Sequence, residues 1–111
     1  LEILVNLLRN ARQSLRDAPV QARRLVVRVA NRSGFVRVEV CDNGLGIAPE
    51  NLARVFQPRF TTKSGGHGLG LHASANAARE LGGSLTAHSE GEGRGATFVL
   101  ELPLRAPGPE A

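Results

Sequence analysis

The sequence is poor in several residue types that mark common protein classes. It contains one cysteine, Cys41, four phenylalanines as its only aromatic residues, and no tryptophan, tyrosine or methionine. A single cysteine cannot form an internal disulfide, which argues against a disulfide-stapled scaffold and favours a reducing compartment. No apolar run approaches the ~20 residues that span a bilayer, and the first residues do not follow the pattern of a signal peptide. We therefore expect a cytoplasmic chain without direct membrane contact, although a longer parent protein could be anchored elsewhere.

Length and composition indicate one compact domain. The 111 residues are 41% hydrophobic and 22% charged, which is ordinary for a globular chain with a single core of two packed layers. The chain begins at Leu1, without a methionine and already inside an amphipathic pattern. We therefore expect a piece of a longer protein, lacking the start of its first helix.

The positive charge does not point to nucleic acid. Fourteen lysines and arginines stand against ten acidic residues, giving a net charge of +4. The basic residues are spread from Arg9 to Arg105, and no tyrosine or tryptophan is available to stack on bases. We expect no nucleic-acid partner.

Apolar side chains at helical spacing predict a helix over residues 1–17. A narrow polar stripe runs along its opposite face, at Asn6, Asn10, Gln13 and Asp17. A solvated surface is the ordinary interpretation of such a stripe. Asparagine is a mediocre helix former, however, so two aligned asparagines also suit a site that needs a neutral oxygen ligand.

The rest of the chain alternates strands with helices. The expected elements are a hairpin turning at 31–34, a short helix from Pro49 to Val55, an exposed loop at 56–68, a helix over 68–81, a second hairpin within 84–103 and a solvated tail at 104–111. Cys41 would end the second strand as a small buried hydrophobe. This order predicts an α+β fold, a two-layer α/β sandwich with helices on one face of a mixed, mostly antiparallel sheet.

Residues 60–80, FTTKSGGHGLGLHASANAARE, place a glycine-rich loop before the last predicted helix. Glycines let backbone N–H groups approach a ligand, and a helix N-terminus carries partial positive charge, so the stretch suits phosphate. It is no P-loop, because no Gly-Lys-Ser/Thr sequence occurs. Gly68, Gly70 and Ala73 fit a dinucleotide fingerprint, but polar residues precede them where that motif has a buried strand.

A second glycine-rich stretch, Asp42-Asn43-Gly44-Leu45-Gly46, ends the second predicted strand. An ionised aspartate only accepts hydrogen bonds, which suits an exocyclic amine such as that of adenine, whereas an Asx turn would explain the same residues without a ligand. Thr97, in the turn Gly93-Arg94-Gly95-Ala96-Thr97-Phe98, would lie near Asp42 if the two strands are neighbours.

Taken in order, NLLRNA, DNGLGI, VFQPRFTTKSGGHGLGLH and GRGATF resemble four motifs of one ATP-binding domain. They are similar to the asparagine box, the first glycine box, the phenylalanine box with the second glycine box, and the third glycine region of sensor histidine kinases. This GHKL superfamily, with its Bergerat-type fold, also holds gyrase, the heat-shock chaperone and the mismatch-repair ATPases. The resemblance implies a catalytic domain over residues 1–103, truncated at its N-terminus, followed by a flexible tail at 104–111.

The resemblance also implies a role for each matching position. Asn10 would bind Mg²⁺, Asn6 would lie beside the phosphates, and Lys63 could reach a phosphate from a lid anchored by Phe56 and Phe60. Asp42 would accept from the adenine amine, with Thr97 supporting it through water. The remaining implied nucleotide contacts are Gly44, Gly46, Phe60, Thr61, Thr62, Gly66, Gly68, Leu69 and Gly70. The sequence departs from many members at Gln13 and Ser14, where they carry a lysine and an aromatic residue.

The implied activity is transfer of the γ-phosphate of ATP to a histidine on a separate dimerisation domain of the same kinase, and from there to a response regulator. Asn6 favours transfer over hydrolysis, because an asparagine cannot act as a general base. Two alternatives stay open: a serine kinase of the same superfamily, disfavoured by Asn6, and a nucleotide-sensing interaction module. His67, His72 and His88 lack the spacing of metal ligands and receive no predicted role.

Overall fold

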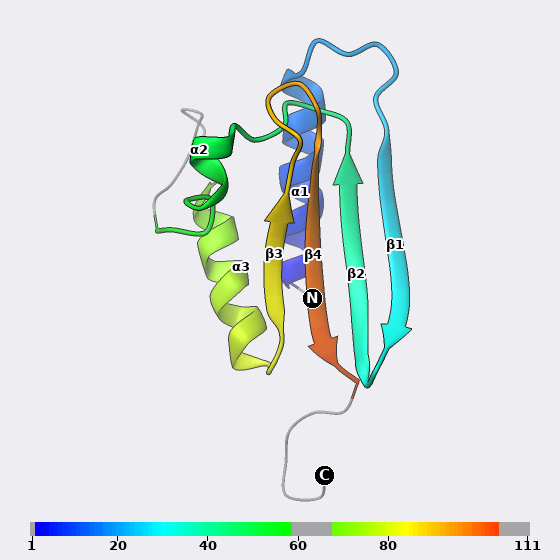
Figure 1. The fold of residues 1–111 in the computed structure, drawn as a ribbon, viewed down its shortest axis with the longest axis vertical. Helices are drawn as coiled ribbons and strands as arrows, with labels where there is room; N and C mark the ends of the chain where they lie inside the picture. Colours follow the sequence, from blue (N-terminus) through cyan, green and yellow to red (C-terminus); the bar gives the residue numbers. More distant parts are fainter. Residues whose placement is uncertain (1, 59–67, 105–111) are drawn as a thin grey trace, which may run out of the picture.

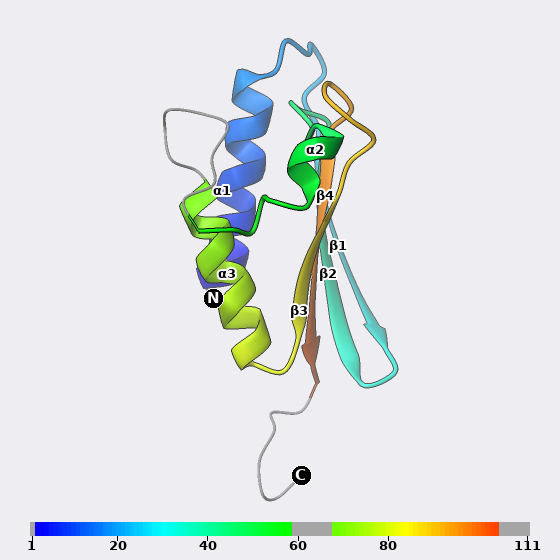
Figure 2. The same ribbon diagram turned by 60° about the vertical axis from the view of Figure 1, so that its left-hand side comes forward.

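The computed structural model describes residues 2–58 and 68–104, without the side chains of residues 68 and 69. Its elements follow in the order α1 (Glu2–Asp17), β1 (Leu25–Arg32), β2 (Phe35–Asp42), α2 (Pro49–Leu52), α3 (Gly68–Glu80), β3 (Ser84–His88) and β4 (Ala96–Pro103). The helices lie on one face of a sheet whose strand order is β1-β2-β4-β3 (Figures 1 and 2). This confirms the α+β sandwich, and every strand pairing in the described part is antiparallel.

The first hairpin forms where its sequence predicts. Ser33 and Gly34 connect β1 to β2 with positive φ angles of 52° and 85°. A two-residue turn with both φ angles positive matches the right-handed twist of the flanking strands. The resulting register pairs Arg32 with Phe35 and, at the far end of the hairpin, Leu25 with Asp42.

The core lies between the helices and the inner face of the sheet. α1 contributes Ile3, Leu7 and Ala11, which are 2%, 0% and 1% exposed. α3, the sheet and the segment after α2 complete the cluster with Leu71, Ala75, Ala78, Val40, Leu85, Ala96, Phe98, Leu100 and Val55. No helix in the described ranges is long and apolar enough to cross a bilayer.

α3 ends at the glycine pair that the sequence marks as a stop. Gly82 has a φ of +86°. Its N–H donates to Arg79 O at 3.0 Å, and the N–H of Gly83 donates to Ala78 O at 2.8 Å. These are the two hydrogen bonds of a Schellman motif, which satisfies carbonyls at the end of a helix.

α2 is shorter than predicted. It spans Pro49–Leu52, whereas the sequence suggested a helix as far as Val55. Beyond Leu52 the backbone forms turns, with Arg54 N donating to Asn51 O and Gln57 N to Arg54 O, each at 2.9 Å. Such i to i+3 bonds are tighter than those of an α-helix and are rarely sustained, so the segment bends instead of extending the helix.

Cys41 differs from the expectation of a buried hydrophobe. Its side chain is half-buried, on the face of the sheet that carries no helix. Its sulfur accepts from the Thr97 hydroxyl and from the Arg28 guanidinium, each at 3.5 Å. Neighbouring strand residues point to opposite faces, so Cys41 lies outside the core that contains Val40.

Candidate functional site

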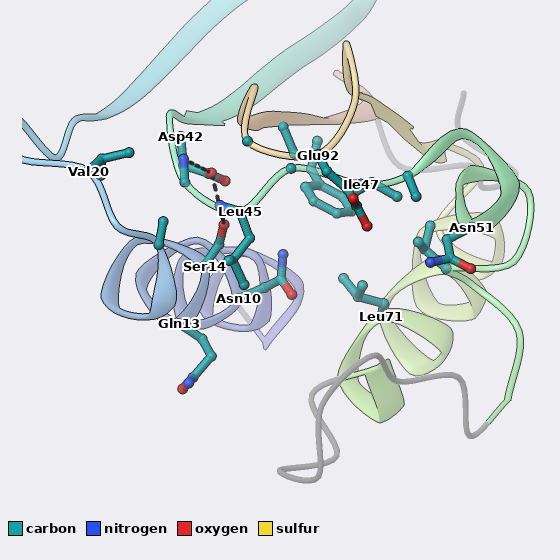
Figure 3. Close-up of a pocket in the computed structure, with 18 of the residues that line it drawn as sticks. Asn10, Gln13, Ser14, Val20, Asp42, Leu45, Ile47, Asn51, Leu71 and Glu92 are labelled. Atoms are coloured by element: carbon teal, nitrogen blue, oxygen red, sulfur yellow. Dashed lines mark hydrogen bonds between the residues drawn. The ribbon is translucent and has the colours of Figure 1, made fainter.

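A cavity of about 590 Å³ opens where α1, the end of β2, α2 and the start of α3 meet (Figure 3). Apolar side chains form most of its wall, with a few polar groups among them. Such a combination is typical of a small-molecule site. The lining includes Asn10, Gln13, Ser14, Asp42, Gly44, Gly46, Ile47, Asn51, Val55, Leu71, Glu92 and Phe98.

Asp42 is the buried carboxylate of this cavity and is 8% exposed. Its Oδ1 accepts from the Ser14 hydroxyl at 3.1 Å and from Gly44 N–H at 2.8 Å. Its Oδ2 is buried and has no hydrogen-bond partner in the described part of the chain. A buried acceptor without a donor is costly, so the cavity lacks one donor that a ligand could supply.

The electrostatics of Asp42 combine opposing effects. Burial raises the pKa of its carboxyl group, because the charged form loses its hydration. Hydrogen bonds from Gly44 N–H and the Ser14 hydroxyl lower the pKa, as does the nearby Ala96 backbone N–H to a smaller extent, without offsetting burial in full. A ligand that donates to Oδ2 would add a further stabilisation of the ionised form.

Ser14 organises this carboxylate and was not predicted to do so. Its hydroxyl donates to Asp42 Oδ1 and also accepts from Leu45 N–H at 2.8 Å. Gly44 packs so closely against Ser14 that a Cβ at position 44 would overlap its hydroxyl and carbonyl. The one signal in the sequence is its position, one helical turn after Asn10 on the same side of α1.

Ser89 connects the turn that contains Gly44 and Gly46 to the turn from Gly91 to Gly95. The sequence did not single out this serine. Its hydroxyl accepts from Ile47 N–H at 3.0 Å and donates to Gly95 O at 2.6 Å. Gly46 has a φ of +74°, and a Cβ there would overlap the carbonyl of Gly91. A side chain at position 46 would therefore separate the two turns.

The two asparagines of α1 occupy different environments. Asn10 lines the cavity (Figure 3). Asn6 lies one turn away, outside the lining, and its amide nitrogen donates to the Ser74 hydroxyl of α3 at 3.0 Å. Gly70 lies against Asn6, at 3.4 Å between an added Cβ and Asn6 Cγ. Asn6 thus joins α1 to α3.

The position of Thr97 contradicts the support predicted for Asp42. The strand register pairs Asp42 with Ala96 and places Thr97 opposite Cys41. Because side chains alternate along a strand, Thr97 points to the helix-free face, away from the Asp42 carboxylate. Its hydroxyl donates to the Cys41 sulfur instead.

Several predicted site residues lie outside the described residues. These are Phe60, Thr61, Thr62, Lys63 and Gly66, together with His67. Gly68, Leu69 and Gly70 form the first turn of α3. Phe56, predicted as an anchor, packs edge to face on Phe98, with ring centroids 6.1 Å apart. His88 is an exposed residue of β3.

The fold and the cavity agree with a family match over nearly the whole chain. Residues 1–106 match the family described as "Histidine kinase-, DNA gyrase B-, and HSP90-like ATPase". The chain belongs to this family, as its motifs predict.

Its relatives narrow the class to sensor histidine kinases. The chain is 50% identical over 111 residues to the two-component sensor PprA of Pseudomonas aeruginosa, and 38% identical over 103 residues to the sensor histidine kinase ZraS of Escherichia coli strain K12. These alignments cover 96% and 93% of the chain but 12% and 21% of the two relatives.

A solved structure supports the same assignment. Full-length ShkA, crystallised in complex with AMPPNP, matches 99% of the chain and 22% of its own length, with a TM-score of 0.78 and 29% sequence identity. The chain is thus an ATP-binding domain of the sensor histidine kinase class, and it corresponds to a minor part of each longer relative.

Proposed function

We propose that this domain binds ATP with its adenine amine on Asp42 and transfers the γ-phosphoryl group to a histidine of a separate dimerisation domain. The observation that carries the proposal is the unpartnered Oδ2 of Asp42 in an otherwise largely apolar cavity. An exocyclic amine is a donor, and a carboxylate is an acceptor only. The nearby Ile47 and Leu71 offer apolar surface for a flat base. The AMPPNP complex of ShkA supports nucleotide binding by a domain of this fold.

Asn10 is the proposed Mg²⁺ ligand. No group of three histidine, cysteine or acidic side chains able to hold a metal occurs in the ranges 2–58 and 68–104. Mg²⁺ takes few protein ligands and relies on water and phosphate oxygens. The side-chain oxygen of Asn10 at the cavity suits this hard cation. When bound, Mg²⁺ neutralises charge on the phosphates.

The transfer step needs positioning more than it needs a base. The acceptor imidazole nitrogen would form a bond to the γ-phosphorus of ATP while the bond to the bridging oxygen breaks, and ADP leaves with that electron pair. Asn6 supports transfer over hydrolysis, since an amide cannot take a proton from water and its nitrogen already donates to Ser74. The phosphoryl group would then pass to an aspartate of a response regulator. A free Cys41 and the use of ATP suit the cytoplasm.

Calorimetric titration with ADP, with and without Mg²⁺, tests the nucleotide site. We expect Asp42→Ala to weaken binding more than tenfold, because it removes a charge-assisted hydrogen bond worth about 1.5–3 kcal/mol. Asn10→Ala should weaken binding only when Mg²⁺ is present. Glu101→Ala is the matched control, because it removes a carboxylate paired with Arg37 on the opposite face of the sheet. Unchanged affinity in both site variants would refute the assignment.

Phosphoryl transfer is tested with radiolabelled ATP and a separately supplied dimerisation domain carrying its histidine. Label on that domain supports the kinase, and its loss in a histidine-to-alanine version identifies the acceptor. Nucleotide binding with no label on the histidine would instead support a nucleotide-sensing interaction module. Label on a serine would support the serine-kinase alternative.

A further inference from the structure

A hydrogen-bond chain connects α3 to the segment that follows α2. The guanidinium of Arg79 donates to Asn76 Oδ1. Asn76 Nδ2 lies 3.2 Å from His72 Nε2, and His72 Nδ1 lies 3.0 Å from the backbone oxygen of Phe56. These four groups are called the His72 chain below.

The two ends of the His72 chain fix the direction of every bond within it. A guanidinium only donates, so Asn76 presents its oxygen to Arg79 and its NH₂ group to His72. A backbone carbonyl only accepts, so His72 must carry a proton on Nδ1. Nε2 of the neutral ring is then free to accept from Asn76, and all three bonds are satisfied in one arrangement.

Phe56 belongs to a segment that forms one wall of the cavity. Asn51 and Val55 line the cavity from this segment, and Leu71 of α3 lines it from another side (Figure 3). The backbone bonds between residues 48 and 57 are local turn bonds, such as Asn51 N to Ala48 O at 2.8 Å. Local bonds shape the segment but do not hold it against α3, whereas the bond from His72 spans 16 residues of sequence.

We propose that His72 is a positioning residue that holds the Asn51–Val55 wall of the cavity against α3 through its Nδ1 proton. Phe56 makes two contacts that connect His72 to the cavity. Its carbonyl accepts from His72, and its ring packs on Phe98, which also lines the cavity. The predicted effect of His72 on nucleotide affinity rests on the proposed function, whereas its effect on the wall does not.

Two replacements of His72 test the contributions of its two ring nitrogens separately. An asparagine carries its amide nitrogen at the same number of bonds from Cβ as Nδ1, so His72→Asn can still donate to Phe56. A glutamine carries its amide nitrogen at the distance of Nε2, so His72→Gln can reach towards Asn76 but not Phe56. His72→Ala removes both contacts. These variants differ in the proposed bond while changing the helix surface little.

Hydrogen exchange of the 111-residue chain without nucleotide measures directly how strongly His72 stabilises the Asn51–Val55 wall. We expect the amides of residues 51–57 to exchange about fivefold faster in His72→Gln and His72→Ala, the loss of one hydrogen bond of about 1 kcal/mol. His72→Asn should stay within about twofold of the wild type. Amides of β2 and β4 should not change in any variant. The proposal is overturned if His72→Asn matches His72→Gln, or if all three variants match the wild type.

Nitrogen NMR of the wild-type ring tests the proposal without any variant, which matters if a replacement fails to fold. The signals of the neutral His72 ring, assigned by sequential connectivity, should show the tautomer with a protonated Nδ1 and an unprotonated Nε2. The opposite tautomer would contradict the bond to Phe56. His67 and His88 serve as internal references.

Titration of the same variants with ADP tests whether the Asn51–Val55 wall affects nucleotide binding. We expect affinity to fall about fivefold in His72→Gln and His72→Ala and to stay within about twofold in His72→Asn. If the wild type itself binds no nucleotide, the proposed function fails, while exchange and NMR still decide the role of His72. If exchange changes as expected but affinity does not, the wall is held by His72 and has no part in binding.

Discussion

At the scale of single residues, Asp42 couples stability to pH. Its buried Oδ2 has no partner, and burial raises the pKa of the carboxyl group above its unfolded value. Between those two pKa values the folded state binds more protons than the unfolded state does. The free energy of unfolding must therefore fall as pH rises through that window, and the contribution of a neutral Asp42 is complete only below the unfolded pKa.

Asp42→Asn should remove this dependence, because an amide occupies the same space and does not ionise. We expect the variant without nucleotide to be more stable than the wild type at neutral pH, and the two to converge below the usual aspartate range of about 4. Urea unfolding at a series of pH values measures the difference. Glu39 has a lowered pKa and gives the opposite slope, but it is present in both proteins and cancels. Parallel curves would contradict the prediction.

The location of a site residue was predictable from the sequence only where a motif marks it. Asp42 and Asn10 both reach the cavity, as their motifs indicate. Ser14 was missed because its partner Asp42 lies 28 residues away, and no local pattern encodes that contact. Thr97 was placed wrongly because the sequence does not reveal strand register, and a slip of one residue exchanges the two faces of a sheet.

At the scale of elements, the spacing of apolar residues predicted the helices and strands whose bounds depend on local sequence. α1, α3 and both hairpins appear close to their expected bounds, since repeated apolar spacing and glycine turns define them. The end of α2 was not predictable in this way. Pro58 would stop a helix only beyond Gln57, and no glycine or proline stands between Leu52 and Gln57. The turn geometry there accompanies contacts of Val55 and Phe56 with distant parts of the core.

Two apolar residues of α1 provide a matched test of how this helix is held. Leu7 is fully buried, whereas Val5 is 48% exposed. We expect Leu7→Ala to lower the free energy of unfolding by about 3 kcal/mol, since it leaves a cavity between α1 and the sheet. Val5→Ala should change it by less than about 0.5 kcal/mol. Urea denaturation at one pH compares them, and equal losses would contradict the packing described here.

At the scale of the whole molecule, the cavity depends on segments that are far apart in the chain. Ser14 of α1, Asp42 of β2, Leu71 of α3 and Phe98 of β4 all contribute to its lining. None of these elements can form the cavity alone. We therefore expect a ligand of the site to stabilise the domain as a unit.

ADP at about 100 times its dissociation constant should raise the free energy of unfolding by about 2.7 kcal/mol, because ligand binds only the folded state. The shift should be seen alike by probes of the helices and of the sheet. Asp42→Ala, with binding weakened more than tenfold, should reduce it to about 1.4 kcal/mol or less at the same ADP concentration. GDP is the matched ligand control, since a guanine in the same pose presents its C6 carbonyl oxygen, an acceptor, where adenine presents its amine to Asp42 Oδ2. Thermal unfolding with each ligand at equal concentration makes the comparison. Equal stabilisation by GDP would show that the unpartnered carboxylate does not select the base, and recognition would then rest on features that the two nucleotides share.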